Sequence, residues 1–158
     1  VGFMGAGKSE LARQLAGLSG RRWIDTDQCV ERDSGRFITR IFKEDGEERF
    51  RTLESLALKN ALKEDNTVVS IGGGAVIQPG NRQLLIDRSF NLWIWSDMEL
   101  ISERIKQSPR PLIQQPSDIA DRMKDRIRFY NEVADLIVPN NGSIEACVKH
   151  IKKELLWE

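Results

Sequence analysis

The sequence predicts an α/β fold in which a parallel sheet of about five strands carries helices on both faces. Short β-branched or aromatic runs alternate with amphipathic stretches, which is typical of parallel strands joined by crossover helices. One glycine-rich turn stands where the first helical stretch begins, and a second glycine run directly follows an apolar strand. The 158 residues contain no repeat, linker or low-complexity segment, so they predict a single domain.

The first half of the chain supplies two alternations of strand and helix. A helical stretch over residues 8–18 places three leucines on one face, and Gly20 ends it. Residues 22–25 form a short strand candidate. Further helical patterns cover residues 27–33, 38–43 and 46–63.

The second half continues the alternation. Thr67–Ile71 (TVVSI) is β-branched throughout most of its length and indicates a buried parallel strand that stops at a glycine. Ser96 followed by Glu99 predicts a capping box for the next helix. The other elements are a helix opened by Pro79 over 81–87, a strand over 90–95, a proline-rich loop over 107–117, a helix over 118–133, a strand over 136–138 and a helix over 143–157.

Composition points to small partners that are recognised locally. The 24 Lys and Arg residues balance 24 Asp and Glu residues, so bulk charge favours neither nucleic acid nor membrane. Cys29 and Cys147 belong to no zinc or redox motif and are expected to be reduced thiols. No apolar run approaches the roughly 18 residues of a membrane span, and no signal peptide is visible. We expect a cytoplasmic monomer that contacts neither nucleic acid nor membrane.

The glycine-rich turn Gly2–Ser9 (GFMGAGKS) fits the P-loop pattern G-x-x-x-x-G-K-[ST]. Glycines let backbone N–H groups wrap a phosphate, and the following helix adds its free N–H groups and positive dipole end. Lys8 would reach the β- and γ-phosphates, and the Ser9 hydroxyl would bind magnesium. A dinucleotide motif is excluded because position 10 is Glu, and a GTPase is disfavoured because no Asn-Lys-x-Asp signature is present.

The start of the chain conflicts with this motif. A P-loop follows a strand, but only Val1 precedes the glycine-rich turn. We therefore expect residues of the first strand to lie upstream of Val1.

Three further groups of residues could bind a second ligand. Asp25 and Asp27 follow the second predicted strand, at the edge where ligands bind in parallel sheets, although a helix N-cap is the favoured explanation when they are taken alone. Arg51 and Glu54 are three residues apart and could pair on one helix face, as a solvated ion pair or as part of a site. The run Gly72–Gly74 would expose backbone to a ligand, or simply form a turn.

A series of motifs along nearly the whole chain is more specific than the P-loop. These are GFMGAGKS, DTD at 25–27, GEERFRTLE at 46–54, GGGA at 72–75, RPL at 110–112 and RIRFYNEVAD at 126–135. In order and spacing they resemble the shikimate kinase family, whose members are P-loop small-molecule kinases. The resemblance implies ATP- and Mg²⁺-dependent phosphorylation of the shikimate 3-hydroxyl, in aromatic amino acid biosynthesis.

The resemblance also implies roles for individual residues. Lys8, Asp27 and Arg110 would carry the chemistry. The ATP site would comprise Gly5, Ala6, Gly7, Lys8, Ser9, Glu10, Arg104 and Arg110, with Arg104 stacked on adenine. The shikimate site would comprise Asp27, Phe42, Phe50, Arg51, Glu54, Gly72, Gly73, Gly74 and Arg126, with Arg51 and Arg126 on the carboxylate. Ser9 and Asp25 would hold the metal, residues 27–63 would form a substrate-binding helical region, and residues 107–117 would form a lid.

Two departures from the family affect the adenine contacts. The stretch between Arg104 and Arg110 is one residue shorter than is typical. Residues 138–143 (VPNNGS) contain Pro139 but lack the proline that the family often has near adenine. Two alternatives remain open at this stage: a kinase for another polyol acid such as gluconate, and a non-catalytic nucleotide-binding module. Intact Lys8, Ser9 and Asp27 argue against the second alternative.

Overall fold

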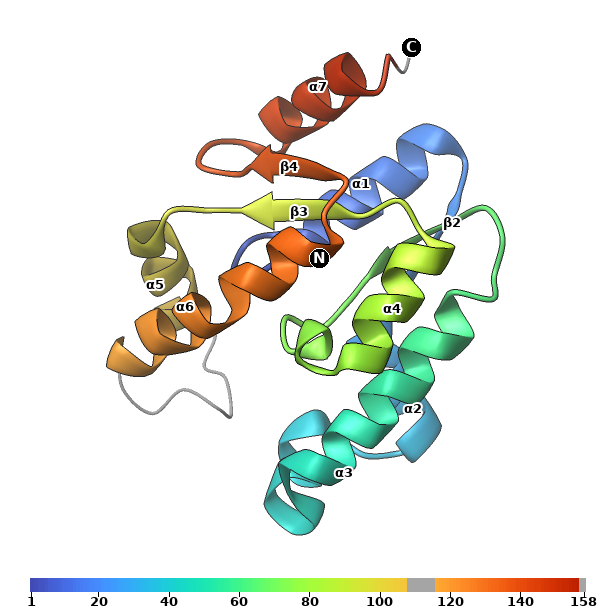
Figure 1. The fold of residues 1–158 in the computed structure, drawn as a ribbon, viewed down its shortest axis with the longest axis vertical. Helices are drawn as coiled ribbons and strands as arrows, with labels where there is room; N and C mark the ends of the chain where they lie inside the picture. Colours follow the sequence, from blue (N-terminus) through green and yellow to red (C-terminus); the bar gives the residue numbers. More distant parts are fainter. Residues whose placement is uncertain (108–115, 157–158) are drawn as a thin grey trace.

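The computed structural model describes residues 1–107 and 116–156, which contain four β-strands arranged as two parallel pairs (Figure 1). Strand β1 (Arg22–Asp25) pairs with β2 (Thr67–Ser70), and β3 (Leu92–Trp95) pairs with β4 (Leu136–Pro139). The predicted parallel pairing is confirmed. The prediction of about five strands is wrong for the described residues, because only a single residue continues the sheet between the two pairs.

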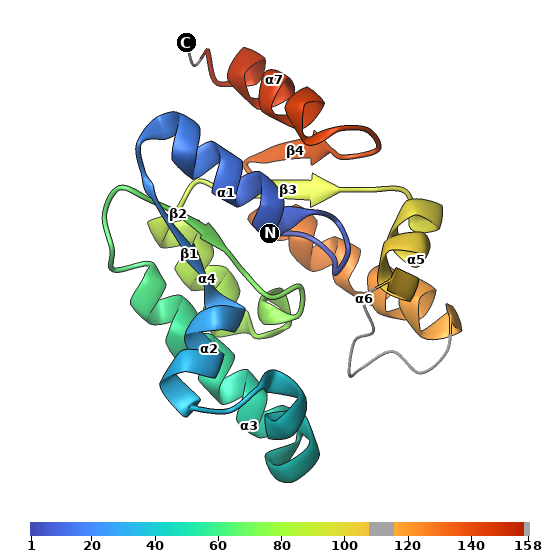
Figure 2. The same cartoon turned by 180° about the vertical axis from the view of Figure 1, so that it is seen from behind.

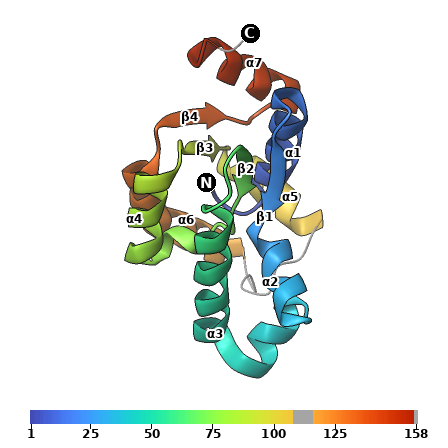
Figure 3. The same cartoon turned by 90° about the vertical axis from the view of Figure 1, so that its right-hand side faces the viewer.

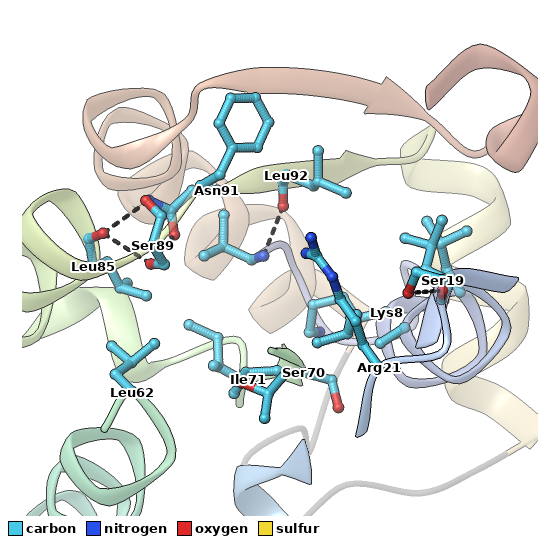
Figure 4. A pocket seen from close by; sticks show the side chains of 18 of the residues that line it. Lys8, Ser19, Arg21, Leu62, Ser70, Ile71, Leu85, Ser89, Asn91 and Leu92 are labelled. Carbon is cyan, nitrogen blue, oxygen red and sulfur yellow. Dashed lines mark hydrogen bonds between the residues drawn. The ribbon is translucent and has the colours of Figure 1, made fainter. Parts of the chain in front are cut away.

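That single residue is Val1, which extends the ladder of β3. Its nitrogen donates to Leu92 O at 2.7 Å, and Ile94 N donates to Val1 O at 2.9 Å. A cavity of about 890 Å³ separates β2 from β3 beyond this point. Figure 4 shows Leu92 on one side of it, and Ser70 and Ile71 on the other.

Helices cover both faces of the strands, as predicted. They are α1 (Lys8–Ser19), α2 (Thr26–Ser34), α3 (Ile38–Ala61), α4 (Pro79–Arg88), α5 (Met98–Gln107), α6 (Pro116–Val133) and α7 (Ile144–Glu154), with the short 3₁₀-helix η1 (Ala75–Ile77). In Figure 3, α1 lies on one side of the strands, and α4 and α6 lie on the other. None of the helices within the described residues is long and apolar enough to cross a bilayer.

A separate hydrophobic core fills each face. Towards α4 and α6, buried side chains include Phe3, Leu58, Val76, Leu85, Met123 and Tyr130. Towards α1 and α7, they include Leu11, Leu15, Ile94, Val138, Val148 and Ile151. Strand β3 serves both cores, since Trp93 packs into the first and Ile94 into the second. Successive strand residues face opposite sides, so a sheet covered on both faces needs an apolar run such as this one.

Helices α2 and α3 extend away from the strands at one end of the molecule (Figures 1 and 2). The two helical patterns expected here form one element that is kinked at Gly46, whose φ of 82° and ψ of 176° are non-helical. Glycine reaches this conformation without the steric cost of a Cβ. A third small core, with Val30, Ile41 and Phe50, joins α2 to α3. This end of the molecule is therefore internally packed around its own core.

The expected capping box at Ser96 is wrong. Helix α5 begins at Met98, and the Ser96 hydroxyl donates to Asn140 O at 2.8 Å. Ser96 is 1% exposed, so its hydroxyl joins the end of β3 to the end of β4 inside the protein. A buried hydroxyl needs a hydrogen-bond partner, and here the partner comes from 44 residues away in sequence.

Candidate active site

The P-loop follows Val1 directly and turns into the first turn of α1. Gly5 and Gly7 have positive φ values of 76° and 84°, which L-residues with a Cβ rarely adopt. Gly7 occupies the N-cap position of α1, where no side chain satisfies the helix's free N–H groups. These N–H groups and the positive end of the helix dipole remain available for an anion.

Lys8 folds back over the loop that precedes it. Its Nζ donates to Phe3 O at 2.9 Å, and Ala6 N donates to the same carbonyl at 3.2 Å. The ammonium is therefore held at the centre of the loop. Glu10, also expected at the ATP site, is exposed on α1 and forms an ion pair with Arg13 at 2.7 Å. The structure thus places Glu10 on the surface of the first turn of α1, and its contact with ATP stays a prediction.

Asp25 connects the P-loop to the second strand pair. Its Oδ2 accepts from the Ser9 hydroxyl at 2.8 Å and from the Ser70 hydroxyl at 2.7 Å. Its Oδ1 accepts from the backbone N–H of Asp27 at 3.0 Å, which makes Asp25 the N-cap of α2. The capping explanation of the acidic pair thus applies to Asp25. Asp27 lies in the first helical turn, where its side chain is not needed for capping.

The oxygen atoms of Ser9 and Asp25 suit a magnesium ion. Mg²⁺ prefers oxygen ligands and keeps several of its waters, so a hydroxyl and one carboxylate beside a phosphate suffice. The described residues contain no cluster of three or more His, Cys, Asp or Glu side chains that could hold a metal without such a phosphate. The donor set therefore fits a metal that arrives with the nucleotide.

The glycine run after β2 is packed against charged side chains at both ends. A Cβ added at Gly72 would overlap Glu54 Oε1 and lie 2.9 Å from Asp27 Oδ1. A Cβ added at Gly74 would overlap the guanidinium of Arg51. Since neither residue has a positive φ, it is this close approach to the ends of two charged side chains, rather than backbone conformation, that favours glycine. The run thus brings three charged side chains of α2 and α3 to one place.

The middle glycine faces the P-loop. A Cβ at Gly73 would lie 3.0 Å from Gly2 O and 3.1 Å from Met4 N, which is tighter than ordinary contact. Its carbonyl accepts a hydrogen bond of 2.6 Å from the Tyr130 hydroxyl of α6. The phosphate loop and the acidic and basic groups of α2 and α3 therefore meet across a single turn of backbone.

Arg51 is held by two glutamates of its own helix. Its Nη1 donates to Glu54 Oε2 at 2.6 Å, and its Nε and Nη2 donate to Glu47 Oε1 at 3.2 and 2.9 Å. Glu54 is 1% exposed, and this burial raises the pKa of its carboxyl although Arg51 opposes the shift. Burial would lower the pKa of Arg51, but the two carboxylates outweigh it and raise the pKa. These bonds use three of the five guanidinium N–H groups, so two remain for a ligand.

Arg126 lies in a different environment. It is 3% exposed on α6, and within the described residues it forms no ion pair. Its guanidinium lies 5.6 Å from the centre of the Phe3 ring. Burial lowers its pKa, and the nearby charge of Arg51 acts in the same direction. A buried cation next to a second cation is a favourable site for an anionic group.

The two phenylalanines expected at the substrate ring lie on α3. Their ring centroids are 4.7 Å apart, and Phe50 is 5% exposed within the third core. The Phe50 ring also lies 5.1 Å from Arg51 Cζ. The Phe50 ring therefore packs against the guanidinium of Arg51. Phe42 is only partly buried. Their contact with a substrate ring stays a prediction.

The nucleotide side is only partly covered by the described residues. Arg104 of α5 donates from Nη1 to Gly5 O at 3.2 Å and to Ser96 Oγ at 3.4 Å, which places it against the P-loop, and its expected stacking on adenine stays a prediction. Arg110 lies outside the described residues, and so does most of the expected lid over 107–117. Their roles stay predictions.

Sequence reasoning assigned no role to three residues that build this site. They are Ser70 on Asp25, Glu47 on Arg51 and Tyr130 on Gly73. Ser70 could have been found as a polar residue at the end of a buried strand, and Tyr130 as a residue one helical turn from Arg126. Glu47 carried no distinct signal, because an i,i+4 pair on a helix is usually a solvated one.

Comparison with known proteins agrees with the site. The family model described as shikimate kinase matches residues 4–156. The shikimate kinase of Pelotomaculum thermopropionicum is 34% identical, over 96% of this chain and 90% of that protein. The shikimate kinase of Histophilus somni is 38% identical, over 89% and 83%. A bifunctional shikimate kinase/3-dehydroquinate synthase from Thermotoga maritima is 39% identical over 84% of this chain, which spans 27% of that longer protein.

Solved structures give the same result. Shikimate kinase from Acinetobacter baumannii in complex with shikimate superposes with a TM-score of 0.92, at 34% identity, over 98% of this chain and 90% of that one. Shikimate kinase from Aquifex aeolicus gives a TM-score of 0.88 at 32% identity, over 99% and 94%. The similarity therefore extends over the strands, the P-loop, α2 and α3 together.

Proposed function

This chain belongs to the shikimate kinase family, and we propose that it transfers the γ-phosphoryl group of ATP to the 3-hydroxyl of shikimate with the residues described above. One observation carries the assignment of residues. The three consecutive glycines after β2 contact Asp27, the P-loop backbone and Arg51 in turn. An acceptor lying on this turn would have its hydroxyl, its ring and its carboxylate next to the groups that each requires.

The phosphate side binds and orients the nucleotide. The N–H groups of the loop and of the first turn of α1 surround the phosphates, and Lys8 exchanges its bond to Phe3 O for the β- and γ-phosphate oxygens. This exchange costs little reorganisation, since the ammonium is already at the loop. In phosphoryl transfer such positioning and charge stabilisation supply most of the catalysis.

The acceptor side orients the hydroxyl and takes its proton. Asp27 faces Gly72 from the first turn of α2, whereas Asp25 is the residue that caps this helix. A carboxylate here accepts from neighbouring ring hydroxyls and receives the proton as the oxygen–phosphorus bond forms. The bond from the γ-phosphorus to the β-phosphate oxygen breaks in the same step and releases ADP.

The carboxylate of the acceptor is bound by two guanidinium groups of different character. Arg126 is a buried cation with no ion pair among the described residues, and a carboxylate would neutralise it. Arg51 offers its two remaining N–H groups from a position fixed by Glu47 and Glu54. Arginine suits this task because its planar fork matches a carboxylate.

Magnesium belongs to the nucleotide in this proposal. Ser9 and Asp25 would hold it, and the ion would neutralise charge on the phosphate oxygens when bound. Ser70 keeps the Asp25 carboxylate turned towards Ser9. The cytoplasmic, monomeric state expected from the sequence remains a prediction.

A coupled ADP-release assay tests the assignment. ATP and Mg²⁺ are supplied with shikimate, with gluconate or without an acceptor, and the phosphorylated product is identified by phosphorus NMR. We expect ADP release that depends on shikimate and a product phosphorylated at the 3-hydroxyl. Equal ADP release with gluconate or without an acceptor would contradict the proposed function.

A further inference from the structure

We infer that Asn140, at the end of β4, is a positioning residue that holds the P-loop in its phosphate-binding conformation. This inference rests on the proposed function and deepens its nucleotide side. Asn140 lies 134 residues from the loop in sequence, yet its Nδ2 donates to Ala6 O at 2.7 Å. The side chain is 1% exposed, so no water competes for this bond.

The backbone of Asn140 is fixed on both sides. Its N–H donates to Trp95 O at 2.7 Å, and its carbonyl accepts from the Ser96 hydroxyl at 2.8 Å. Both partners stand at the end of β3, which is the strand that also pairs with the residue before the P-loop. The amide group is therefore presented to the loop by the sheet itself.

The orientation of the amide is determined by its two neighbours. Ala6 O can only accept, so it requires the NH₂ group of Asn140. On the other side, Cys147 of α7 is buried, and its Sγ lies 3.3 Å from Asn140 Oδ1 and 3.3 Å from Pro139 O, so the thiol hydrogen can be donated to either oxygen. Burial raises the pKa of the Cys147 thiol, which keeps that hydrogen in place. Exchanging the two amide ends would put an acceptor oxygen against Ala6 O and an NH₂ donor against the thiol of Cys147.

The bond to Ala6 O controls a phosphate-binding group. The Ala6–Gly7 peptide is trans and planar, so its N–H points away from its carbonyl. Holding Ala6 O against Asn140 therefore turns the Gly7 N–H away from Asn140. Arg104 holds the preceding carbonyl, Gly5 O, at 3.2 Å. Two successive carbonyls of the loop are thus fixed from outside before any phosphate arrives.

The close approach of Asn140 also accounts for one glycine of the motif. A Cβ at Gly7 would overlap Asn140 Nδ2, in addition to the strain of its positive φ. The P-loop and the end of β4 are therefore fitted to each other. A loop without this contact would have to fix its own carbonyls when the nucleotide binds, and affinity would fall because that ordering is no longer done in advance.

The experiment compares Asn140→Ala with Asn91→Ala. Asn91 is also buried, at the opposite end of β3 from Asn140, and its Nδ2 holds a backbone carbonyl outside the P-loop, Leu85 O, at 3.1 Å. Binding of MgADP alone, and of shikimate alone, is measured by calorimetry, and Tm is recorded for each variant. Asn140→Ser is a second, milder variant that keeps a polar group in the site.

We expect Asn140→Ala to weaken MgADP binding about tenfold, which is the loss of one buried hydrogen bond that orders the loop, and to leave shikimate affinity within about twofold. Asn140→Ser should weaken MgADP binding by less. Asn91→Ala should lower Tm and leave MgADP affinity unchanged. In turnover, KM for ATP should rise in both Asn140 variants while KM for shikimate stays constant.

Two results would overturn the inference: MgADP affinity within about twofold of the parent in both folded Asn140 variants, or equal weakening of MgADP by Asn91→Ala. Neither result depends on the acceptor. A parent protein that binds MgADP but does not phosphorylate shikimate would instead contradict the proposed function.

Discussion

The two sides of the candidate site are built in different ways. The phosphate side comes mainly from eight consecutive residues, Gly2–Ser9, and presents backbone N–H groups and one ammonium. The acceptor side is assembled from α2, α3, the glycine run after β2 and α6, and it presents buried charged side chains. A phosphate can be bound by a local loop because every N–H is an equivalent donor. A carboxylate and a hydroxyl at fixed separation need groups from distant parts of the chain.

This difference predicts that substitutions on the two sides affect different ligands. Changes in the P-loop should lower turnover with every acceptor. Changes on the acceptor side should act on shikimate and spare the nucleotide.

The largest effect is expected at Lys8. Lys8→Ala removes the one side-chain cation of the loop, so kcat should fall by about 10²–10³-fold. Steady-state turnover with saturating ATP and shikimate measures this loss. Lys63→Ala, an exposed lysine after α3, is the control and should be silent. Near-parental turnover in a folded Lys8→Ala protein would remove the loop from the mechanism.

Asp27→Asn should give the next largest effect. It keeps size and one acceptor oxygen but loses the charge and basicity, so kcat/KM for shikimate should fall by at least about 10²-fold. MgADP affinity, measured by calorimetry, should change little because Asp25 faces Ser9 instead. Asp33→Asn, on the exposed side of α2, serves as the control. Activity within a few-fold of the parent would exclude Asp27 as the base.

The two arginines of the acceptor side sharpen the comparison further. Arg126→Met should raise KM for shikimate about 10- to 100-fold, since a charge-assisted contact in a closed site is lost. The Tm of Arg126→Met should stay the same or rise, because the substitution removes a buried cation that has no ion pair among the described residues. Arg51→Met should also raise KM but should lower Tm, because it leaves Glu54 buried without its cation.

Arg128→Met is the matched control for Arg126. Arg128 lies on the same helix but is exposed, so both KM and Tm should stay near the parental values. The assignment fails if Arg126→Met and Arg51→Met weaken MgADP and shikimate equally in calorimetry, because the clamp would then not be specific to the acceptor.

The smallest effect is expected at Ser70, which acts on the site through Asp25. Ser70→Ala removes one of the two hydroxyls that orient Asp25, so KM for MgATP should rise only about two- to fivefold. Its dependence on Mg²⁺ concentration should shift to higher values by a similar factor. Ser89→Ala, which removes a hydroxyl bonded to Leu85 O away from the site, should shift neither quantity.

The elements themselves were predictable because they depend on local patterns. The strands at 22–25 and 67–71 and the helices from Lys8 and Pro79 were found within about two residues, which is the usual uncertainty of element ends. The error at Ser96 has a physical cause. A serine three residues before a glutamate is a local signal, but a buried hydroxyl follows the nearest strong acceptor, and only the fold brings Asn140 O beside it.

The sequence alone determined the α/β class, the P-loop and the family, because each depends on residue order over short distances. The tertiary structure decided that, of two aspartates separated by one residue, Asp25 caps α2 and Asp27 lies against Gly72. It also decided that Arg51 is held by glutamates, whereas Arg126 lies buried with no ion pair to any residue that the structure describes. These outcomes depend on burial and on contacts across many residues, such as the 134 that separate Ala6 from Asn140. A local pattern cannot specify them, since the same residues on a solvated surface would make none of these contacts.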